Sequence, residues 1–134
     1  MNMPTVSTIE DLSYYFGPAR KEHMEVWTYS ADGQSLCALL SGDVGWLMYL
    51  RENGDTGFST RNPNYRGPND TIIEYRLENG QTDTYPAAWA LPVTELQKAV
   101  AYFITNAKPA PWLVWHNDSG DGVVINQQAG LSRE

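Results

Sequence analysis

The strongest structural signal in the sequence lies in Leu91–Trp115, which reads LPVTELQKAVAYFITNAKPAPWLVW. Its apolar side chains recur at helical spacing and form one stripe, while the polar side chains take the opposite face. Thr94 and Gln97 are spaced as a capping box, in which the threonine hydroxyl accepts from the amide three residues on. Asn106, followed by Pro109 and Pro111, ends the pattern. The stretch predicts a helix, then an apolar strand at Trp112–Trp115. The stripe comprises Val93, Leu96, Ala99, Val100, Phe103 and Ile104.

Upstream of this helix the pattern is that of short strands separated by tight turns. The run Val44–Arg51 is apolar on both faces, so we expect it near the centre of a sheet. Tight-turn dipeptides between apolar runs favour an antiparallel meander. The turn signals are Asp32-Gly33, Gly42-Asp43, Asn53-Gly54 and Asn79-Gly80. The expected strands cover residues 24–30, 36–40, 44–51, 57–60, 71–77 and 82–85.

A second, shorter helix is expected near the N-terminus. Ser7 and Glu10 have the spacing of a capping box, and Gly17-Pro18 stops the apolar periodicity that follows. The order of elements predicts an α+β fold: an antiparallel meander of about five to seven strands with an N-terminal and a C-terminal helix packed on one face. The length suits one domain. We expect residues 1–116 to form it and residues 117–134 to form a polar C-terminal tail.

The charge balance indicates the kind of partner. Sixteen acidic residues against nine basic ones give a formal net charge of -7. Nucleic acid would be repelled, whereas a basic protein partner would be attracted. The alternative interpretation is that the acidic surplus only keeps the protein soluble. Cys37 is the single cysteine, and no secretory signal or membrane-length apolar run occurs. We expect a soluble, cytoplasmic protein without nucleic-acid or membrane partners.

Residues for catalysis are scarce. His23 and His116 have no metal-ligand neighbour at helical spacing, and Cys37 lies in an apolar strand, where burial raises a thiol pKa. Phosphate-binding glycine loops and nucleophile elbows are missing from the sequence. We therefore expect no enzyme, no cofactor and no metal. A Cys–His pair and a hydrolase with two convergent carboxylates remain as alternatives.

The residues of Leu91–Trp115 also carry a family resemblance. With the apolar Gly45–Leu50, the Asn-Gly turn, a strand holding Tyr75 and the turn before Pro86, this stretch resembles the Imm-one family of immunity proteins. Its motif residues here are Pro92, Leu96, Phe103, Pro109 and Trp115. The resemblance implies an α+β fold without catalysis and inhibition by tight binding to a cognate toxin. Such proteins accompany deaminase-type and other toxins of bacterial polymorphic toxin systems.

Our first hypothesis is therefore a bacterial immunity protein that binds and neutralises a toxin. We expect this toxin to be a basic protein and a nucleic-acid-targeting or deaminase-type enzyme. The loop Arg61–Asp70 and the adjoining hairpin turns are the expected binding surface, because loops tolerate change and carry contacts. Arg61 and Tyr65 are the expected anchors. The expected electrostatic contacts are Asp43, Glu52, Asp55 and Asp70.

A second hypothesis is a module that binds a small ligand or a peptide in an aromatic pocket beside the sheet. The side chains expected to line that pocket are Trp27, Trp46, Tyr49 and Trp89. The oligomeric state stays open at this point.

Overall fold

The computed structural model describes residues 4–125, and its elements confirm the α+β class. No helix in that range is both long and apolar enough to span a bilayer. The elements are α1 (Ile9–Phe16), β1 (His23–Tyr29), β2 (Ser35–Ser41), β3 (Val44–Leu50), β4 (Phe58–Arg61), β5 (Ile72–Arg76), β6 (Thr82–Pro86), the 3-10 turn η1 (Ala87–Trp89), β7 (Leu91–Pro92), α2 (Val93–Asn106) and β8 (Val114–Asn117).

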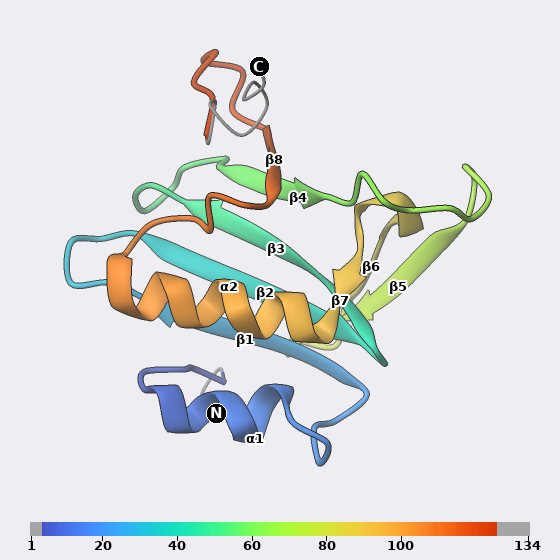
Figure 1. The fold of residues 1–134 in the computed structure, drawn as a ribbon, viewed down its shortest axis with the longest axis horizontal. Coiled ribbons are helices and arrows are strands. Elements are labelled where there is room, and N and C mark those ends of the chain that lie inside the picture. The colour runs from blue at the N-terminus through green and yellow to red at the C-terminus, as the bar shows by residue number, and fades with distance from the viewer. Residues whose placement is uncertain (1–3, 126–134) are drawn as a thin grey trace.

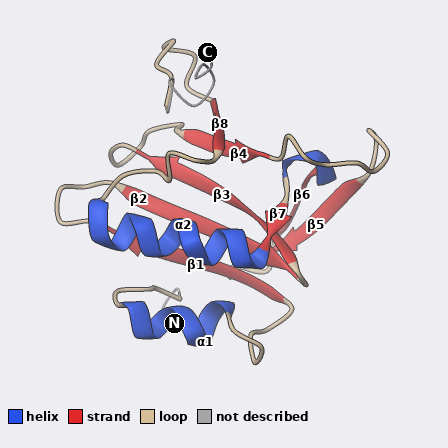
Figure 2. Ribbon diagram, in the orientation of Figure 1, coloured by secondary structure: helices blue, strands red, loops and turns tan. Residues whose placement is uncertain are grey.

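The strands form two antiparallel sheets, where the sequence predicted one meander (Figures 1 and 2). The larger sheet has the order β1-β2-β3-β4-β8, and β7 pairs separately with β3. The β5–β6 hairpin is a sheet of its own. The single meander was therefore wrong at β5, because β8 takes the place beside β4. Antiparallel pairing confirms the predicted hairpins β1–β2, β2–β3, β3–β4 and β5–β6.

Strand β2 is buried on both faces. Leu36, Ala38 and Leu40 lie in one hydrophobic core together with buried side chains of α1 and α2. Cys37 and Leu39 lie in a second core with Tyr75 of the hairpin. Because alternate residues of a strand point to opposite faces, the two cores lie on opposite sides of the sheet. Figure 1 shows α2 running across β1, β2 and β3, with α1 beside it near β1.

Both helices start at other residues than predicted. In α1 the cap is Thr8, whose hydroxyl accepts from the amide of Asp11, and the Asp11 carboxylate accepts from the amides of Ser7 and Thr8. The Ser7–Glu10 box was thus one residue early, and the helix ends before Gly17 as expected. In α2 the cap is Pro92, without a side-chain hydrogen bond, so the Thr94 box was also wrong. Strand β7 leads straight into α2, which leaves Thr94 inside the first turn.

The start of α2 is held against β3 by a close approach at Gly45. A Cβ atom there would lie 2.3 Å from Cδ1 of Leu96 and 2.4 Å from the carbonyl oxygen of Leu39. Only glycine permits this contact. The amide of Val93 also donates to the carbonyl of Asp43 at 2.9 Å. The N-terminus of α2 is therefore fixed beside the sheet, with Leu96 and Phe103 fully buried.

The last strand begins two residues later than predicted. Strand β8 covers Val114–Asn117 and pairs with β4, whereas Trp112 lies in the preceding turn. The indole Nε1 of Trp115 donates to the carbonyl of Ala110 at 2.9 Å, which closes that turn. Trp115 packs against the helix-side core, and the turn leaves Trp112 about half exposed.

Candidate functional site

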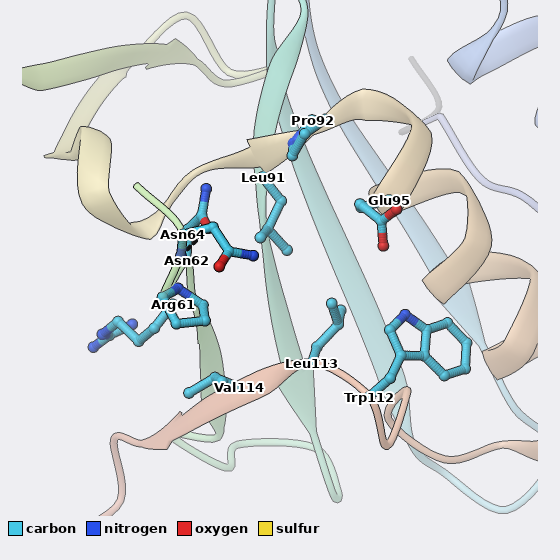
Figure 3. A pocket seen from close by; sticks show the side chains of 10 residues that line it. Arg61, Asn62, Asn64, Leu91, Pro92, Glu95, Trp112, Leu113 and Val114 are labelled. Atoms are coloured by element: carbon cyan, nitrogen blue, oxygen red, sulfur yellow. Dashed lines mark hydrogen bonds between the residues drawn. The ribbon is translucent and has the colours of Figure 1, made fainter. Parts of the chain in front are cut away.

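A groove with a volume of about 490 Å³ opens between the end of β4, the start of α2 and the approach to β8. Figure 3 shows it with Leu91 and Leu113 inside, Asn62 and Asn64 on one side and Glu95 and Trp112 on the other. Its walls are mostly apolar with a few polar groups, which is the usual character of a binding site. The lining is completed by Arg61, Pro63, Pro92 and Val114.

The groove exists because two strands share one edge of β3. Strand β4 pairs with β3 at Met48 and Tyr49, while β7 pairs with it at Val44 and Gly45. Between these contacts the amide of Leu47 donates to the side-chain hydroxyl of Thr60 at 3.1 Å. Beyond Thr60 the chain leaves β3, so the two partners of β3 diverge and leave a hollow between them.

Asn62 keeps that hollow from opening further. Its backbone amide donates to the carbonyl of Ala88 at 3.0 Å, and its side-chain Nδ2 donates to the carbonyl of Ala90 at 2.8 Å. Its Oδ1 accepts from the amide of Asn64 at 2.9 Å. One side chain thus ties the chain after β4 to the segment that leads into β7.

Trp112 and Glu95 form one wall. The side chain of Trp112 is 49% exposed and meets the ring of Tyr102 edge-on, with 5.4 Å between the centroids. The Glu95 carboxylate is 3.3 Å from the ammonium group of Lys98, whose side chain is 65% exposed. Both wall residues therefore keep accessible surface, since the Glu95 side chain is 33% exposed beside Lys98.

Arg61 stands on the opposite side, and its guanidinium turns away from the hollow (Figure 3). It lies over the ring of Trp89 and donates to Ser59 Oγ and to the carbonyl of Thr60, each at 2.9 Å. Burial lowers the pKa of Arg61, and the Asp118 carboxylate 3.9 Å away opposes that shift. The guanidinium is thus engaged inside the molecule.

Of the predicted residues in the loop Arg61–Asp70, Arg61 lines the groove. Tyr65 lies outside that lining, and its hydroxyl donates to the carbonyl of Pro68 at 2.9 Å within the loop. Asp70 is exposed near the end of the loop.

The other predicted acids lie at the two ends of β3. Asp43 precedes the strand, with a side chain 96% exposed and 2.9 Å from Arg20. Glu52 and Asp55 follow the strand, on the turn into β4. Asp55 is only 8% exposed, because Arg51 donates to it from its amide at 2.9 Å and from its guanidinium at 2.8 Å. These hydrogen bonds hold the pKa of Asp55 well below its usual range.

The sequence interpretation missed Trp112 and Glu95 as site residues. Trp112 was assigned to the last strand and Glu95 to the polar face of the helix. Pro109 and Pro111 were the available signal that the last strand begins after Trp112. A proline lacks the backbone N–H that strand pairing needs, so pairing starts later in the chain. Whether the turn before β8 faces a groove depends on how β4 and β7 share one edge of β3. Local sequence patterns do not encode such a long-range arrangement.

The aromatic side chains of the second hypothesis are divided between the two cores. Tyr49 belongs to the helix-side core, while Trp46 belongs to the hairpin-side core. Trp46 stacks on Tyr85 with 4.2 Å between centroids, and Trp27 and Trp89 pack against the same core. The three tryptophan rings thus pack between the sheet and the hairpin, Tyr49 packs on the helix side, and none of the four lines the groove.

The nucleophilic side chains of Cys37 and Ser59 are both buried. Burial raises the pKa of the Cys37 thiol far above its ordinary value. Ser59 Oγ donates to Asp118 at 2.7 Å, and His116 Nδ1 is 2.8 Å from the same carboxylate. The histidine thus contacts Asp118 rather than the buried hydroxyl of Ser59, whereas a catalytic base must reach the nucleophile. Within residues 4–125, no group of three or more His, Cys, Asp or Glu side chains is placed to hold a metal ion.

The first part of the predicted tail is fastened to the body. The amide of Asp118 donates to the carbonyl of Gly57 at 2.8 Å, and the Asp121 carboxylate is 2.7 Å from Arg51 Nη1. Residues 126–134 of that tail lie outside the described residues.

The family model described as Immunity protein Imm1 matches residues 3–116, which include every residue that lines the groove. No curated protein matches the chain.

Proposed function

We propose that this chain, which belongs to the Imm1 family of immunity proteins, binds a cognate toxin protein and neutralises it without catalysis. The family match over residues 3–116 carries the proposal. The toxin is a deaminase-type or another nucleic-acid-targeting enzyme of a bacterial polymorphic toxin system, and the two proteins meet in the cytoplasm. The residues of the proposed binding domain are 1–116.

Electrostatics support a basic partner. An enzyme that acts on nucleic acid needs a positive surface to hold phosphates. A protein of net charge -7 is attracted to such a surface, which speeds their encounter. Asp43, Glu52 and Asp70 are the exposed carboxylates that we propose for this steering.

The contact residues are proposed around the groove. Trp112 is the main anchor, because a half-exposed indole at the wall of a hollow resembles the residues that dominate protein interfaces. Arg61 lines the same groove, and Tyr65, farther along the loop Arg61–Asp70, is proposed as a second anchor beside it. We propose an indirect role for Asp55: its carboxylate accepts hydrogen bonds from the amide and the guanidinium of Arg51, and these hold the turn that presents Glu52.

The test is protection and complex formation with the toxin domain encoded beside this chain. Cells that express the toxin should survive when this protein is co-expressed, and the two purified proteins should form a complex in calorimetric titration. Leu96→Asp is the matched negative control, because a charge at this fully buried position disrupts the core. If the wild-type protein gives no protection and forms no complex with the toxin domain, the proposed function is wrong.

A further inference from the structure

We propose that the groove receives an extended segment of the toxin and that a lysine or arginine of this segment lies between Glu95 and Trp112. The inference rests on the proposed function and specifies the chemistry of its contact. Three features of the groove carry it: its apolar interior, its charge and the sheet edge beside it.

The interior of the groove suits the apolar part of a peptide. Leu91 and Leu113 are buried side chains at its base, and Pro63 and Pro92 stand at its sides. The proline rings and the buried leucines are fixed by the backbone and the core. The hollow is therefore present before a partner arrives, which lowers the entropic cost of binding.

The charge that faces the groove is negative. Glu95 and Arg61 are the charged residues that line it, and the guanidinium of Arg61 is engaged with Trp89 and Ser59. The Glu95 carboxylate faces the hollow in Figure 3, on the same wall as the Trp112 indole. A carboxylate next to an indole face matches a cationic side chain, which pairs with the former and packs on the latter.

The present partner of Glu95 is easily replaced. Lys98 is one turn away on the exposed side of α2, and an exposed ion pair at this spacing contributes little to stability. A cation that enters the groove is partly shielded from water by the leucine and proline side chains. It therefore interacts with Glu95 more strongly than Lys98 does in solvent.

The neighbouring sheet edge favours an extended backbone. Strand β8 is the outermost strand beside β4 among the described strands, and its first residue, Val114, lines the groove with an exposed side chain. An outer strand presents unpaired backbone amides and carbonyls on its free side. A peptide segment can add to this edge by main-chain hydrogen bonds while its side chains enter the groove.

Calorimetric titration of the intact protein with the toxin domain tests this contact through matched variants. Trp112→Ala should weaken binding by at least about thirtyfold, as the loss of a central anchor does. Glu95→Gln keeps shape and removes charge, and should weaken binding about tenfold with a smaller dependence on salt. Lys98→Ala should tighten binding, because it removes the competing cation. Tyr14→Ala and Glu10→Gln, on α1 away from the groove, are the matched controls and should bind as the wild-type protein does.

The outcomes separate the two proposals. If the wild-type protein binds no toxin, the proposed function is wrong. If the wild-type protein binds and both Trp112→Ala and Glu95→Gln bind equally well, the function stands and the groove contact is wrong. Far-ultraviolet circular dichroism of each variant excludes unfolding as the cause of a loss. Sedimentation of the free protein adds one more check: a dimer that Trp112→Ala dissociates would make the groove a contact between copies and overturn the inference.

Discussion

The guanidinium of Arg61 lies 3.7 Å from the centroid of the Trp89 ring, so the end of β4 is stacked on the 3-10 turn that follows β6. This contact joins the large sheet to the hairpin-side layer at the border of the groove. Trp89 in turn stacks with Tyr85, at 5.9 Å between centroids. The position of the loop Arg61–Asp70 therefore depends on a planar cation over an aromatic ring.

Arg61→Lys should lower the free energy of unfolding by about 1–2 kcal/mol, because an ammonium group loses the planar stacking and the forked hydrogen bonds of a guanidinium. Urea denaturation followed by circular dichroism measures the change. Arg66→Lys is the control, since Arg66 is exposed and lies in the same loop. Equal stability of Arg61→Lys and the wild-type protein would contradict a structural role for the stack.

Tyr75→Phe should leave the protein as stable or make it up to about 1 kcal/mol more stable, because the Tyr75 hydroxyl is buried without a hydrogen-bond partner among the described residues. Burial raises the pKa of Tyr75 far above its ordinary value, which fits an apolar surrounding. The control is Tyr85→Phe, which loses a hydrogen bond of 3.2 Å to Asp83 and should be less stable. A clear loss of stability in Tyr75→Phe would mean that the Tyr75 hydroxyl has a hydrogen-bond partner in solution.

Ala107→Gly should raise the free energy of unfolding by about 0.5–1 kcal/mol. Ala107 ends α2 in the left-handed region, with φ 56° and ψ 31°, where a Cβ atom is unfavourable. Thermal unfolding of the two proteins provides the comparison. Ala110→Gly, at a buried position without positive φ, should be destabilising instead. If Ala107→Gly were less stable, the packing of the alanine methyl group would stabilise the fold by more than the left-handed backbone conformation destabilises it.

Asp55→Asn should destabilise the protein at pH 7, and the difference from the wild type should shrink as the pH falls below about 4. The pKa of Asp55 is lowered, chiefly by hydrogen bonds from the Arg51 side chain. A lowered folded-state pKa contributes stability above the unfolded value, and this contribution is lost as the carboxylate becomes protonated at lower pH. Urea midpoints between pH 7 and pH 3 measure it. Glu52→Gln, on the same turn, should follow the wild-type curve; a constant difference for Asp55→Asn would refute the linkage.

Local sequence patterns predicted those helices and strands whose bounds are not changed by tertiary contacts. The apolar run of β3 and the turn glycines Gly33, Gly54 and Gly80 placed the hairpins, and each of these glycines has positive φ. The stripe on α2 predicted its buried face, since Leu96, Val100 and Phe103 are all buried. These signals depend on residues a few positions apart, which a sequence displays directly.

The errors came from contacts between distant segments. Pro92 caps α2 because β7 pairs with β3, although Thr94 has the better capping side chain. The β5–β6 hairpin left the meander because β8, much later in the chain, pairs with β4. The groove follows from the pairing of both β4 and β7 with one edge of β3. The loop that borders the groove was therefore predictable, and the wall residues Glu95 and Trp112 were not.

The distribution of the five tryptophans gives the protein separate optical reporters. Trp115 packs against the helix-side core, Trp27, Trp46 and Trp89 lie in or against the hairpin-side core, and Trp112 stands at the groove. A molecule that docks at the groove should change the emission of one indole while the other four keep the spectrum of the folded state. Fluorescence can therefore tell occupancy from denaturation without any attached dye.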